Sequence, residues 1–263
     1  MCGKIVLSKR MHAVASLVTP GNSVCDVGCD HGFIPIYLVK QGIAPKALAM
    51  DVNEGPLRQA KEHIAAFGLE SYIETRISDG IASCRPGEAD SLICAGMGGK
   101  LMQRILSEEK EKTDSFQELI LQPQSELQQF RSFLRREGYL ITDENMIEED
   151  GKFYPMMKAV PNKETIPQGN SSDAYSQKQL WRQRIEDRYG PVLLKQKNPV
   201  LYRYLEREKR ICEEVLINLQ KRRNAASDRG KREKEVEGQI QDCLRVLELF
   251  DKREGAGYGK NKD

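Results

Sequence analysis

The chain has 263 residues, of which 39% are hydrophobic and 30% are charged, and its formal net charge is +2. This length allows one large domain or two smaller ones, and the composition predicts a soluble globular protein with an unusually charged portion. Lys and Arg number 18 against 22 Asp and Glu in residues 1–160, but 23 against 17 in residues 161–263. This division argues against a general nucleic-acid wrapper and favours an acidic enzyme body with a basic arm that binds anions.

The N-terminus and the cysteines predict a cytoplasmic protein without a metal site. Residues 1–18 contain no long apolar core before a small-residue cleavage site, and no segment of the chain approaches about 18 consecutive apolar residues. We therefore expect no membrane contact. The seven cysteines include no C-x2-C pair, so reduced thiols are expected, and Cys25 and Cys29 lack the His or Cys partners that zinc requires.

Residues 23–135 alternate between short runs rich in β-forming residues and helical stretches. The expected strands are "SVCDVG", "KALAMDV", "IETRISDG", "ADSLICAG" and "ELILQP". Helical stretches lie between most of them, and this alternation predicts a parallel α/β sheet. Beyond Gly138 the pattern changes to two strands around Glu149, Asp150 and Gly151, which predicts a terminal hairpin.

The rest of the chain is expected to hold a linker, a helical domain and a tail. After a first domain at residues 1–160, residues 161–175 are rich in Pro, Asn, Ser and Gly, which is typical of a linker. Residues 176–254 are helical, with a turn near residue 227, and 255–263 form a flexible tail. We expect an antiparallel coiled-coil hairpin in a monomer, although the same seam could pair two chains. The apolar seam comprises Leu201, Leu205, Cys212, Val215, Leu219, Val236, Ile240, Cys243, Leu247 and Phe250.

The segment 24–38, "VCDVGCDHGFIPIYL", predicts a ligand-binding turn between the first strand and its helix. Gly28 and Gly32 let the backbone approach a ligand closely, and the helix that follows points N–H groups toward it. The dinucleotide fingerprint G-x-G-x-x-G needs a glycine where this chain has Asp30, so the turn is unsuited to a pyrophosphate. Outside this segment, His12 and His63 are expected on ordinary helix surfaces.

Four carboxylates are expected at the carboxyl ends of successive strands, where doubly wound sheets bind ligands. They belong to Asp26, Asp30, Asp51 and Asp79. At an effective dielectric constant of about 20, like charges about 4 Å apart cost about 4 kcal/mol, so a phosphate-free and partly cationic ligand fits better. S-adenosylmethionine is such a ligand, with its ribose at Asp51, its adenine at Asp79 and its carboxylate on the glycine turn. Any one of these acids alone could instead be a turn or helix cap.

The segment "GMGGKL", residues 96–101, follows a predicted strand and contains three glycines. It lacks both the first glycine of a phosphate-binding loop and the Ser or Thr that would bind magnesium. Glycines in this position still indicate a close backbone approach, here beside the transferable methyl group. We expect Gly96, Met97 and Gly98 to line the pocket for the acceptor base, with packing beneath the sheet edge as the alternative for Met97.

Six segments carry a family resemblance: "LSKRM", "DVGCDHGFIPIYL", "AMDVNEGPL", "SDG", "CAGMGGKLM" and "LQPQSE", in this order. With them, and over nearly its whole length, the chain resembles the bacterial tRNA (adenine-N1)-methyltransferase family called TrmK. The resemblance implies a class I methyltransferase with a Rossmann-like sheet, S-adenosylmethionine as cofactor, and methylation of N1 of adenosine 22 in tRNA. The chain lacks the Asn-Pro-Pro-Tyr type of motif found in many adenine methyltransferases, so the contacts to the target base are not identified.

The resemblance also implies roles for single residues. The cofactor residues it implies are Asp26, Gly28, Asp30, His31 and Gly32 on the methionine side, Asp51 and Val52 at the ribose and adenine, Asp79 and Gly80 at the adenine, and Gly96 to Gly98 beside the sulfonium. Because N1 of adenine has an in-plane lone pair, a general base is not required, and alignment of the reacting atoms would be the main task of the protein.

Basic residues in two places are candidates for contacts with tRNA phosphates. The set comprises Lys9 and Arg10 before the first strand, and Lys221, Arg222, Arg223, Arg229, Lys231, Arg232 and Lys234 at the tip of the helical hairpin. A solvated helix face is the alternative for both groups. Two other functions stay open: a class I methyltransferase that acts on a small molecule or protein, and a non-catalytic RNA-binding protein with a vestigial cofactor fold.

Overall fold

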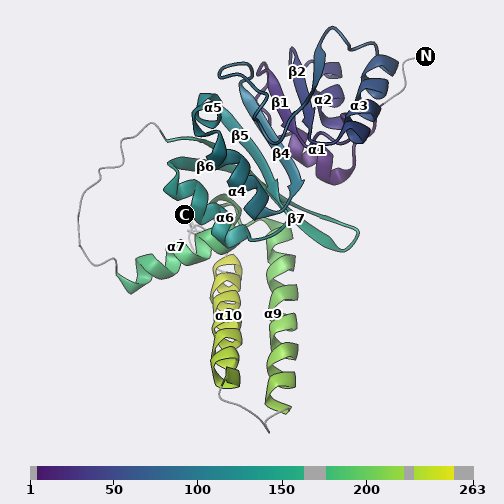
Figure 1. Ribbon diagram of the computed structural model, residues 1–263. Coiled ribbons are helices and arrows are strands. Elements are labelled where there is room, and N and C mark those ends of the chain that lie inside the picture. The colour runs from purple at the N-terminus through teal and green to yellow at the C-terminus, as the bar shows by residue number, and fades with distance from the viewer. Residues whose placement is uncertain (1–4, 163–175, 222–227, 252–263) are drawn as a thin grey trace, which may run out of the picture. The chain divides into compact units, whose positions relative to one another are not determined.

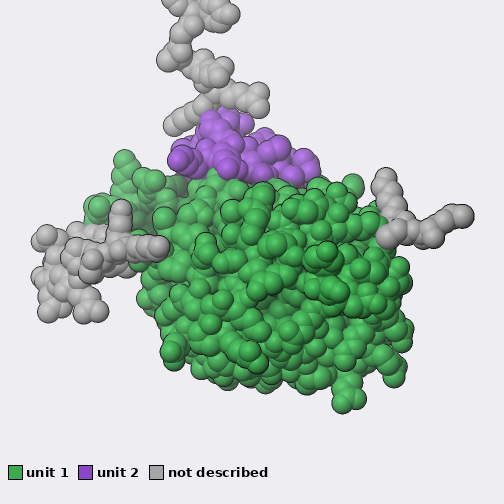
Figure 2. All heavy atoms as spheres, turned by 90° about the horizontal axis from the view of Figure 1, so that it is seen from above, with its two compact units in different colours: residues 1–193 green, residues 194–263 purple. Residues whose placement is uncertain are grey.

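The computed structural model describes residues 5–162, 176–221 and 228–251 (Figure 1). The expected tail and most of the expected linker lie outside these residues. The chain divides into two compact units, residues 1–193 and 194–263, which are green and purple in Figure 2. The division falls after residue 193 rather than within 161–175, because helix α7 (Gln177–Tyr189) packs on helix α6 (Leu127–Arg136) of the first unit.

A seven-stranded sheet with the strand order β3-β2-β1-β4-β5-β7-β6 forms the first unit. Its parallel strands are β1 (Val24–Val27), β2 (Ala47–Asp51), β3 (Ile73–Ile77), β4 (Ser91–Met97) and β5 (Glu118–Pro123). Strand β7 (Lys152–Pro161) runs antiparallel to β5, and β6 (Tyr139–Glu149) pairs with β7 at the edge. This arrangement confirms the Rossmann-like sheet with a terminal hairpin, including the turn at Asp150 and Gly151.

Helices cover both faces of the parallel strands, so these strands are buried on both sides. In β4, Ile93 belongs to one hydrophobic cluster, and Leu92 and Cys94 belong to the other. Helices α1 (Lys9–Ala15), α2 (Phe33–Lys40) and α3 (Glu54–Ala66) contribute to the first cluster. Helices α4 (Gly99–Glu108) and α6 contribute to the second, and the short helix α5 (Lys110–Ser115) leads into β5. This alternation explains why the strands read as continuous apolar runs in the sequence.

A buried ion pair anchors α7 and helix α8 (Pro191–Lys195). Nε of Arg131 on α6 lies 2.9 Å from Oε1 of Glu144 on β6, and both side chains are buried. Arg131 also donates to the carbonyl oxygens of residues 187 and 188 at the end of α7, and Glu144 accepts from the N–H groups of residues 192 and 193. Each charge therefore lies at the helix end that its sign stabilises: the guanidinium at the carboxyl end of α7, and the carboxylate at the amino end of α8.

The second unit contains two long helices, α9 (Pro199–Lys221) and α10 (Asp228–Asp251). They run antiparallel, since residue 212 contacts residue 239, residue 208 contacts residue 243, and the rings of Tyr202 and Phe250 lie 5.8 Å apart. Most of the expected apolar seam is buried, but Val246 is fully buried where Leu247 was expected. A helical pair is present as predicted, whereas a coiled-coil geometry stays a prediction. None of the helices within the described ranges is long and apolar enough to cross a membrane.

Candidate active site

The predicted site residues lie at one edge of the sheet, at the carboxyl ends of the parallel strands. Asp51 is the last residue of β2, Asp26 is next to the last residue of β1, and Asp79 follows β3. Because β1, β2 and β3 are parallel neighbours, their carboxyl ends share one edge of the sheet, which we call the carboxyl rim; Figure 1 labels β1 and β2. The fold therefore brings together acids and glycine-rich loops that are far apart in the sequence.

The turn after β1 is built for a close approach of two loops. Gly28 has a φ of +69°, and a Cβ on this residue would lie 2.3 Å from Cε of Met97. Only glycine therefore fits this turn without strain and without displacing Met97. The N–H groups of Gly28 and Cys29 donate to the carbonyl oxygen of Met50 on β2, at 2.8 and 2.9 Å. Met97 thus links the two glycine-rich loops, a contact that the sequence does not reveal.

Two of the four acids are buried in the rim. Asp26 and Asp51 are 3% and 8% exposed. Burial, and then the negative charges of Asp51 and Asp30, raise the pKa of Asp26 to about 8. One oxygen of Asp51 accepts a 2.9 Å hydrogen bond from the N–H of Asn53. Buried carboxyl groups of this kind gain free energy from a ligand that supplies hydroxyl donors or a positive charge.

Asp30 and His31 lie on the outer side of the β1 turn. Nε2 of His31 is 3.5 Å from Oδ1 of Asp30, and the Asp30 side chain is 66% exposed. The carbonyl oxygen of His31 lies 2.9 Å from Nδ1 of His63, whose ring stacks on Phe33 with the centroids 5.0 Å apart. His63 is therefore a support of the ligand loop rather than an ordinary surface residue. Nothing in the spacing of these residues indicates the contact.

Asp79 forms an ion pair with Arg104, a residue that the sequence did not indicate as part of the site. The guanidinium of Arg104 on α4 donates to both oxygens of Asp79, at 2.9 and 3.3 Å. These hydrogen bonds and the Arg104 charge lower the pKa of Asp79. Gly80, the next residue, packs against α4, since a Cβ there would lie 3.0 Å from Cγ1 of Ile105. The rim near β3 therefore combines a negative and a positive charge.

Large apolar side chains are exposed beside the buried acids. Val52, directly after Asp51, is 59% exposed, and Ile77, which pairs in register with Asp51, is 46% exposed. Apolar side chains at adjacent strand ends offer a surface on which a flat aromatic ring can lie. Asp51 and Val52 are the residues for which the resemblance implies contacts with the ribose and adenine of the cofactor.

Gly96 is a bulge in the pairing of β4 with β5. The register shifts between Ala95 and Met97, and the N–H of Gly96 donates instead to Oε1 of Gln122 on β5, at 3.1 Å. The same oxygen accepts a 3.1 Å hydrogen bond from Nη1 of Arg10. Gln122 is fully buried, and its Nε2 has no hydrogen-bond partner among the described residues. The bulge is therefore held by a side chain that the sequence reasoning did not single out.

Arg10 lies at this bulge rather than on an open helix surface. It is half-buried, and its guanidinium lies over the ring of Tyr154 on β7, 5.8 Å from the centroid. Nearby, a Cβ on Gly98 would lie 3.2 Å from Oγ of Ser125 in the loop after β5. The loop after β4 is thus packed between α1 and the loop after β5.

The remaining basic candidates lie outside the rim. Lys9, Lys221, Lys231, Arg232 and Lys234 are exposed, and Arg232 pairs with Glu235 at 2.7 Å. Arg222, Arg223 and the side chain of Arg229 fall outside the described part of the chain. Within the residues that the structure describes, no cluster of His, Cys, Asp and Glu could hold a metal ion.

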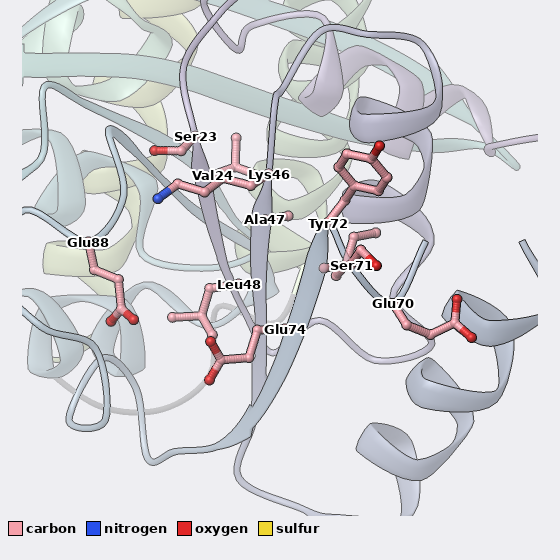
Figure 3. A pocket seen from close by; sticks show the side chains of 11 residues that line it. Ser23, Val24, Lys46, Ala47, Leu48, Glu70, Ser71, Tyr72, Glu74 and Glu88 are labelled. Carbon is pink, nitrogen blue, oxygen red and sulfur yellow. The ribbon is translucent and has the colours of Figure 1, made fainter. Parts of the chain in front are cut away.

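A separate hollow of about 360 Å³ lies at the opposite edge of the sheet (Figure 3). Its lining includes Val24, Ala47 and Ile73, which are the first residues of β1, β2 and β3. Figure 3 also shows Glu70, Glu74 and Glu88 around it. Because it is at the amino ends of the strands, this hollow is distinct from the carboxyl rim where ligands of such sheets bind.

The strand order and the acidic, glycine-lined rim define a class I methyltransferase. In agreement, residues 7–157 match the family model described as "Methyltransferase domain". A curated relative, the tRNA (adenine(22)-N(1))-methyltransferase of Bacillus subtilis (strain 168), is 36% identical over 197 residues, which are 75% of this chain and 79% of the relative. The chain belongs to this tRNA (adenine(22)-N(1))-methyltransferase family, which confirms the resemblance.

Two solved structures show relatives with cofactor or product. Streptococcus pneumoniae Sp1610 in complex with S-adenosyl-L-methionine superimposes with a TM-score of 0.76 at 30% identity, covering 92% of this chain and 100% of that one. M. capricolum TrmK in complex with S-adenosyl-homocysteine superimposes with a TM-score of 0.73 at 26% identity, covering 93% of this chain and 99% of that one. Both alignments include most of the helical second unit, because the first unit alone would account for a much smaller share of the chain.

Proposed function

We propose that this protein transfers the methyl group of S-adenosylmethionine to N1 of adenosine 22 in tRNA. The observation that carries the proposal is the carboxyl rim with its two buried acids and its glycine cradle at Gly28, in a chain of the tRNA (adenine(22)-N(1))-methyltransferase family. The rim disfavours phosphate and suits a ligand that combines hydroxyl groups with positive charge.

The residues of the rim fit S-adenosylmethionine, whose sulfonium supplies an electrophilic methyl group. Buried Asp51 has an oxygen free of the Asn53 contact for the ribose hydroxyls, and Val52 offers an apolar surface to the adenine. The N–H groups at the start of α2 suit the carboxylate of the methionine portion. We assign the cofactor to Asp26, Gly28, Asp30, His31, Gly32, Asp51, Val52, Asp79, Gly80 and Gly96.

The main catalytic task of the protein is to orient the target base. N1 of adenine is unprotonated at neutral pH and can attack without a general base, so alignment of N1 with the methyl group can supply about 7–11 kcal/mol of the rate enhancement. N1 is hidden in a paired stem, so the nucleotide has to be unpaired or flipped out. We assign the wall of the base pocket to Gly96, Met97 and Gly98.

We assign tRNA phosphate contacts to the exposed basic side chains outside the rim. They are Lys9 and the residues expected at the hairpin tip: Lys221, Arg222, Arg223, Arg229, Lys231 and Arg232. Arg10, the other basic candidate near the first strand, donates to Gln122, and we assign it a role in positioning the loop after β4. A tRNA substrate also supports our proposal that the protein works in the cytoplasm. We propose that it acts as a monomer.

The test is transfer of a labelled methyl group to a tRNA transcript, followed by nucleoside analysis. We expect 1-methyladenosine with unmodified transcript, and no incorporation when adenosine 22 is replaced by guanosine. Incorporation that survives this replacement, or label in a different nucleoside, would contradict the proposal.

A further inference from the structure

The carboxyl rim continues beyond the residues assigned to the cofactor. In the strand order, β2 and β1 lie on one side of β4, and β5 lies on the other. The assigned cofactor residues lie at or just after the carboxyl ends of β1, β2 and β3, and the last of them is Gly96 on β4. Given the proposed function, on which this inference rests, the acceptor base meets the methyl group on the β5 side of Gly96.

Polar side chains from two elements flank Gly96 on that side. A Cβ at Gly96 would lie 3.5 Å from Nη1 of Arg10 and 3.7 Å from Nε2 of Gln124. Gln124 follows β5, and its N–H donates to the carbonyl oxygen of Met97 at 2.8 Å, which fixes its backbone beside the loop after β4. The Gln124 side chain is exposed, and among the described residues none forms a hydrogen bond with it.

We propose that the side-chain amide of Gln124 determines specificity by binding the N6 and N7 atoms of the target adenine. A glutamine amide is complementary to this edge, because its oxygen accepts from the N6 amino group and its nitrogen donates to N7. Binding there leaves N1, on the other edge of the base, free to attack the methyl group. Guanine presents acceptors at both positions, so the amide oxygen would face O6 without a hydrogen bond.

The neighbouring polar groups cannot take this role. Oε1 of Gln122 already accepts hydrogen bonds from Gly96 and Arg10. Arg10 carries only donors, so it cannot accept a hydrogen bond from the N6 amino group. Gln122 and Arg10 are therefore positioning residues that hold Gly96, and Gln124 is the exposed amide that can contact the base.

The experiment compares a full-length tRNA that carries adenosine at position 22 with one that carries 7-deazaadenosine there. Single-turnover methyl transfer is measured with wild type, Gln124→Ala and Gln129→Ala, the last being an exposed glutamine on α6. Loss of N7 removes one hydrogen bond of the pair, so we expect the adenosine-to-deazaadenosine rate ratio to fall roughly 10-fold in Gln124→Ala relative to wild type. Gln129→Ala should keep the wild-type ratio. The analogue also changes the basicity of N1, but this change affects every protein equally. It therefore cancels when the rate ratios of the proteins are compared.

Affinity for S-adenosylmethionine, measured by calorimetry, should be the same in all the proteins, because Gln124 lies on the acceptor side of Gly96. The assignment is overturned if the adenosine-to-deazaadenosine rate ratio is the same in wild type and Gln124→Ala. It is also overturned if this ratio falls as much in Gln129→Ala as in Gln124→Ala. A wild-type protein that does not methylate the adenosine-containing tRNA would instead contradict the proposed function.

Discussion

Gly28 and Gly21 both have positive φ values, but only Gly28 has a close neighbour. Alanine substitutions at the two positions therefore distinguish the cost of backbone strain from the cost of a steric clash. Their φ values are +69° and +93°, and a Cβ would meet Met97 at the first and nothing within 4 Å at the second. We expect Gly28→Ala and Gly21→Ala each to lower the free energy of unfolding by about 1–2 kcal/mol, the cost of left-handed backbone in an L-residue. Urea denaturation measures this change.

Only Gly28→Ala should also weaken binding of S-adenosylmethionine, because its methyl group displaces Met97 from the β1 turn. Titration calorimetry of both variants checks this difference. Equal affinities in the two variants would show that the Gly28–Met97 contact does not shape the cofactor site.

Asp26 should lower the free energy of unfolding as the pH rises, which is the opposite of the usual effect of an aspartate. Its pKa is raised from 3.8 to about 8, so the folded protein binds its proton more tightly than the unfolded chain does between these values. The contribution of Asp26 to stability therefore falls as the pH rises through this range. We expect Asp26→Asn to gain stability over wild type progressively from pH 5 to pH 8, as measured by urea denaturation in a series of buffers.

Asp90→Asn is the control for this measurement, since hydrogen bonds from Ser23 lower the pKa of Asp90. Its charge stabilises the folded state at neutral pH, and this stabilisation is lost as the pH falls. The control should therefore be less stable than wild type at pH 7. The same sign of effect in both variants would contradict the raised pKa of Asp26.

The sequence was sufficient to place the acids of the rim but not their partners. Asp51 and Asp79 are predictable because they lie at or just after the end of a recognisable strand, and parallel strands end at the same edge. The contacts of Arg104 with Asp79 and of His63 with the β1 turn depend on how separate helices pack on the sheet. No spacing within one element contains that information.

At the scale of elements, the Arg131–Glu144 pair is the anchor of α7. Replacing one partner leaves the other charge buried without compensation, at a cost of about 3–5 kcal/mol. We expect Glu144→Gln, which keeps the shape of the side chain, to lower the free energy of unfolding by this amount. Urea denaturation monitored by fluorescence of Trp181, on α7, checks both the magnitude and whether α7 detaches.

Arg135→Met provides the matched comparison on the same helix. Arg135 pairs with Asp187 of α7, but its side chain is 43% exposed. Because the guanidinium is open to solvent, although Asp187 is only 13% exposed, this pair should contribute less than the fully buried one. Similar losses from Arg135→Met and Glu144→Gln would mean that burial does not set the strength of this anchor.

This anchor also explains why the domain boundary differed from the expectation. The composition of residues 161–175 predicts a linker, and α7 has mostly polar residues, so nothing in the sequence ties α7 to the sheet. Arg131 and Glu144 themselves read as surface residues of an amphipathic helix and an edge strand. Their burial follows only once both elements are in place.

At the scale of the whole molecule, charge is divided between the acidic residues 1–160 and the basic remainder. If Lys221 and Lys231 bind phosphates, replacing both by alanine should flatten the dependence of tRNA affinity on salt, by about 0.9 in logarithmic slope for each phosphate that is no longer neutralised. Filter binding over a range of salt concentrations measures the slope.

Lys46→Ala combined with Arg85→Ala removes the same net charge from exposed positions of the first unit. This control should lower affinity slightly while leaving the slope as in wild type. Equal slopes in all three proteins would remove Lys221 and Lys231 from the binding surface.

The parallel sheet and its terminal hairpin could be predicted across the first unit, because alternating strands and helices admit few topologies. The residues that we propose around the target base could not all be predicted, because they come from α1, β4 and the loop after β5. They are brought together by the bulge at Gly96, and a one-residue irregularity in a ladder leaves no periodic trace in the sequence.

That bulge also limits how the protein can change in evolution. The N–H of Gly96 has left the ladder and depends on the Gln122 side chain, which in turn receives Arg10. An apolar residue at position 122 would leave both the N–H of Gly96 and the half-buried guanidinium of Arg10 without this acceptor. The residues at positions 10, 96 and 122 therefore depend on one another. A change at one of these positions is expected to be accepted in evolution only together with changes at the others.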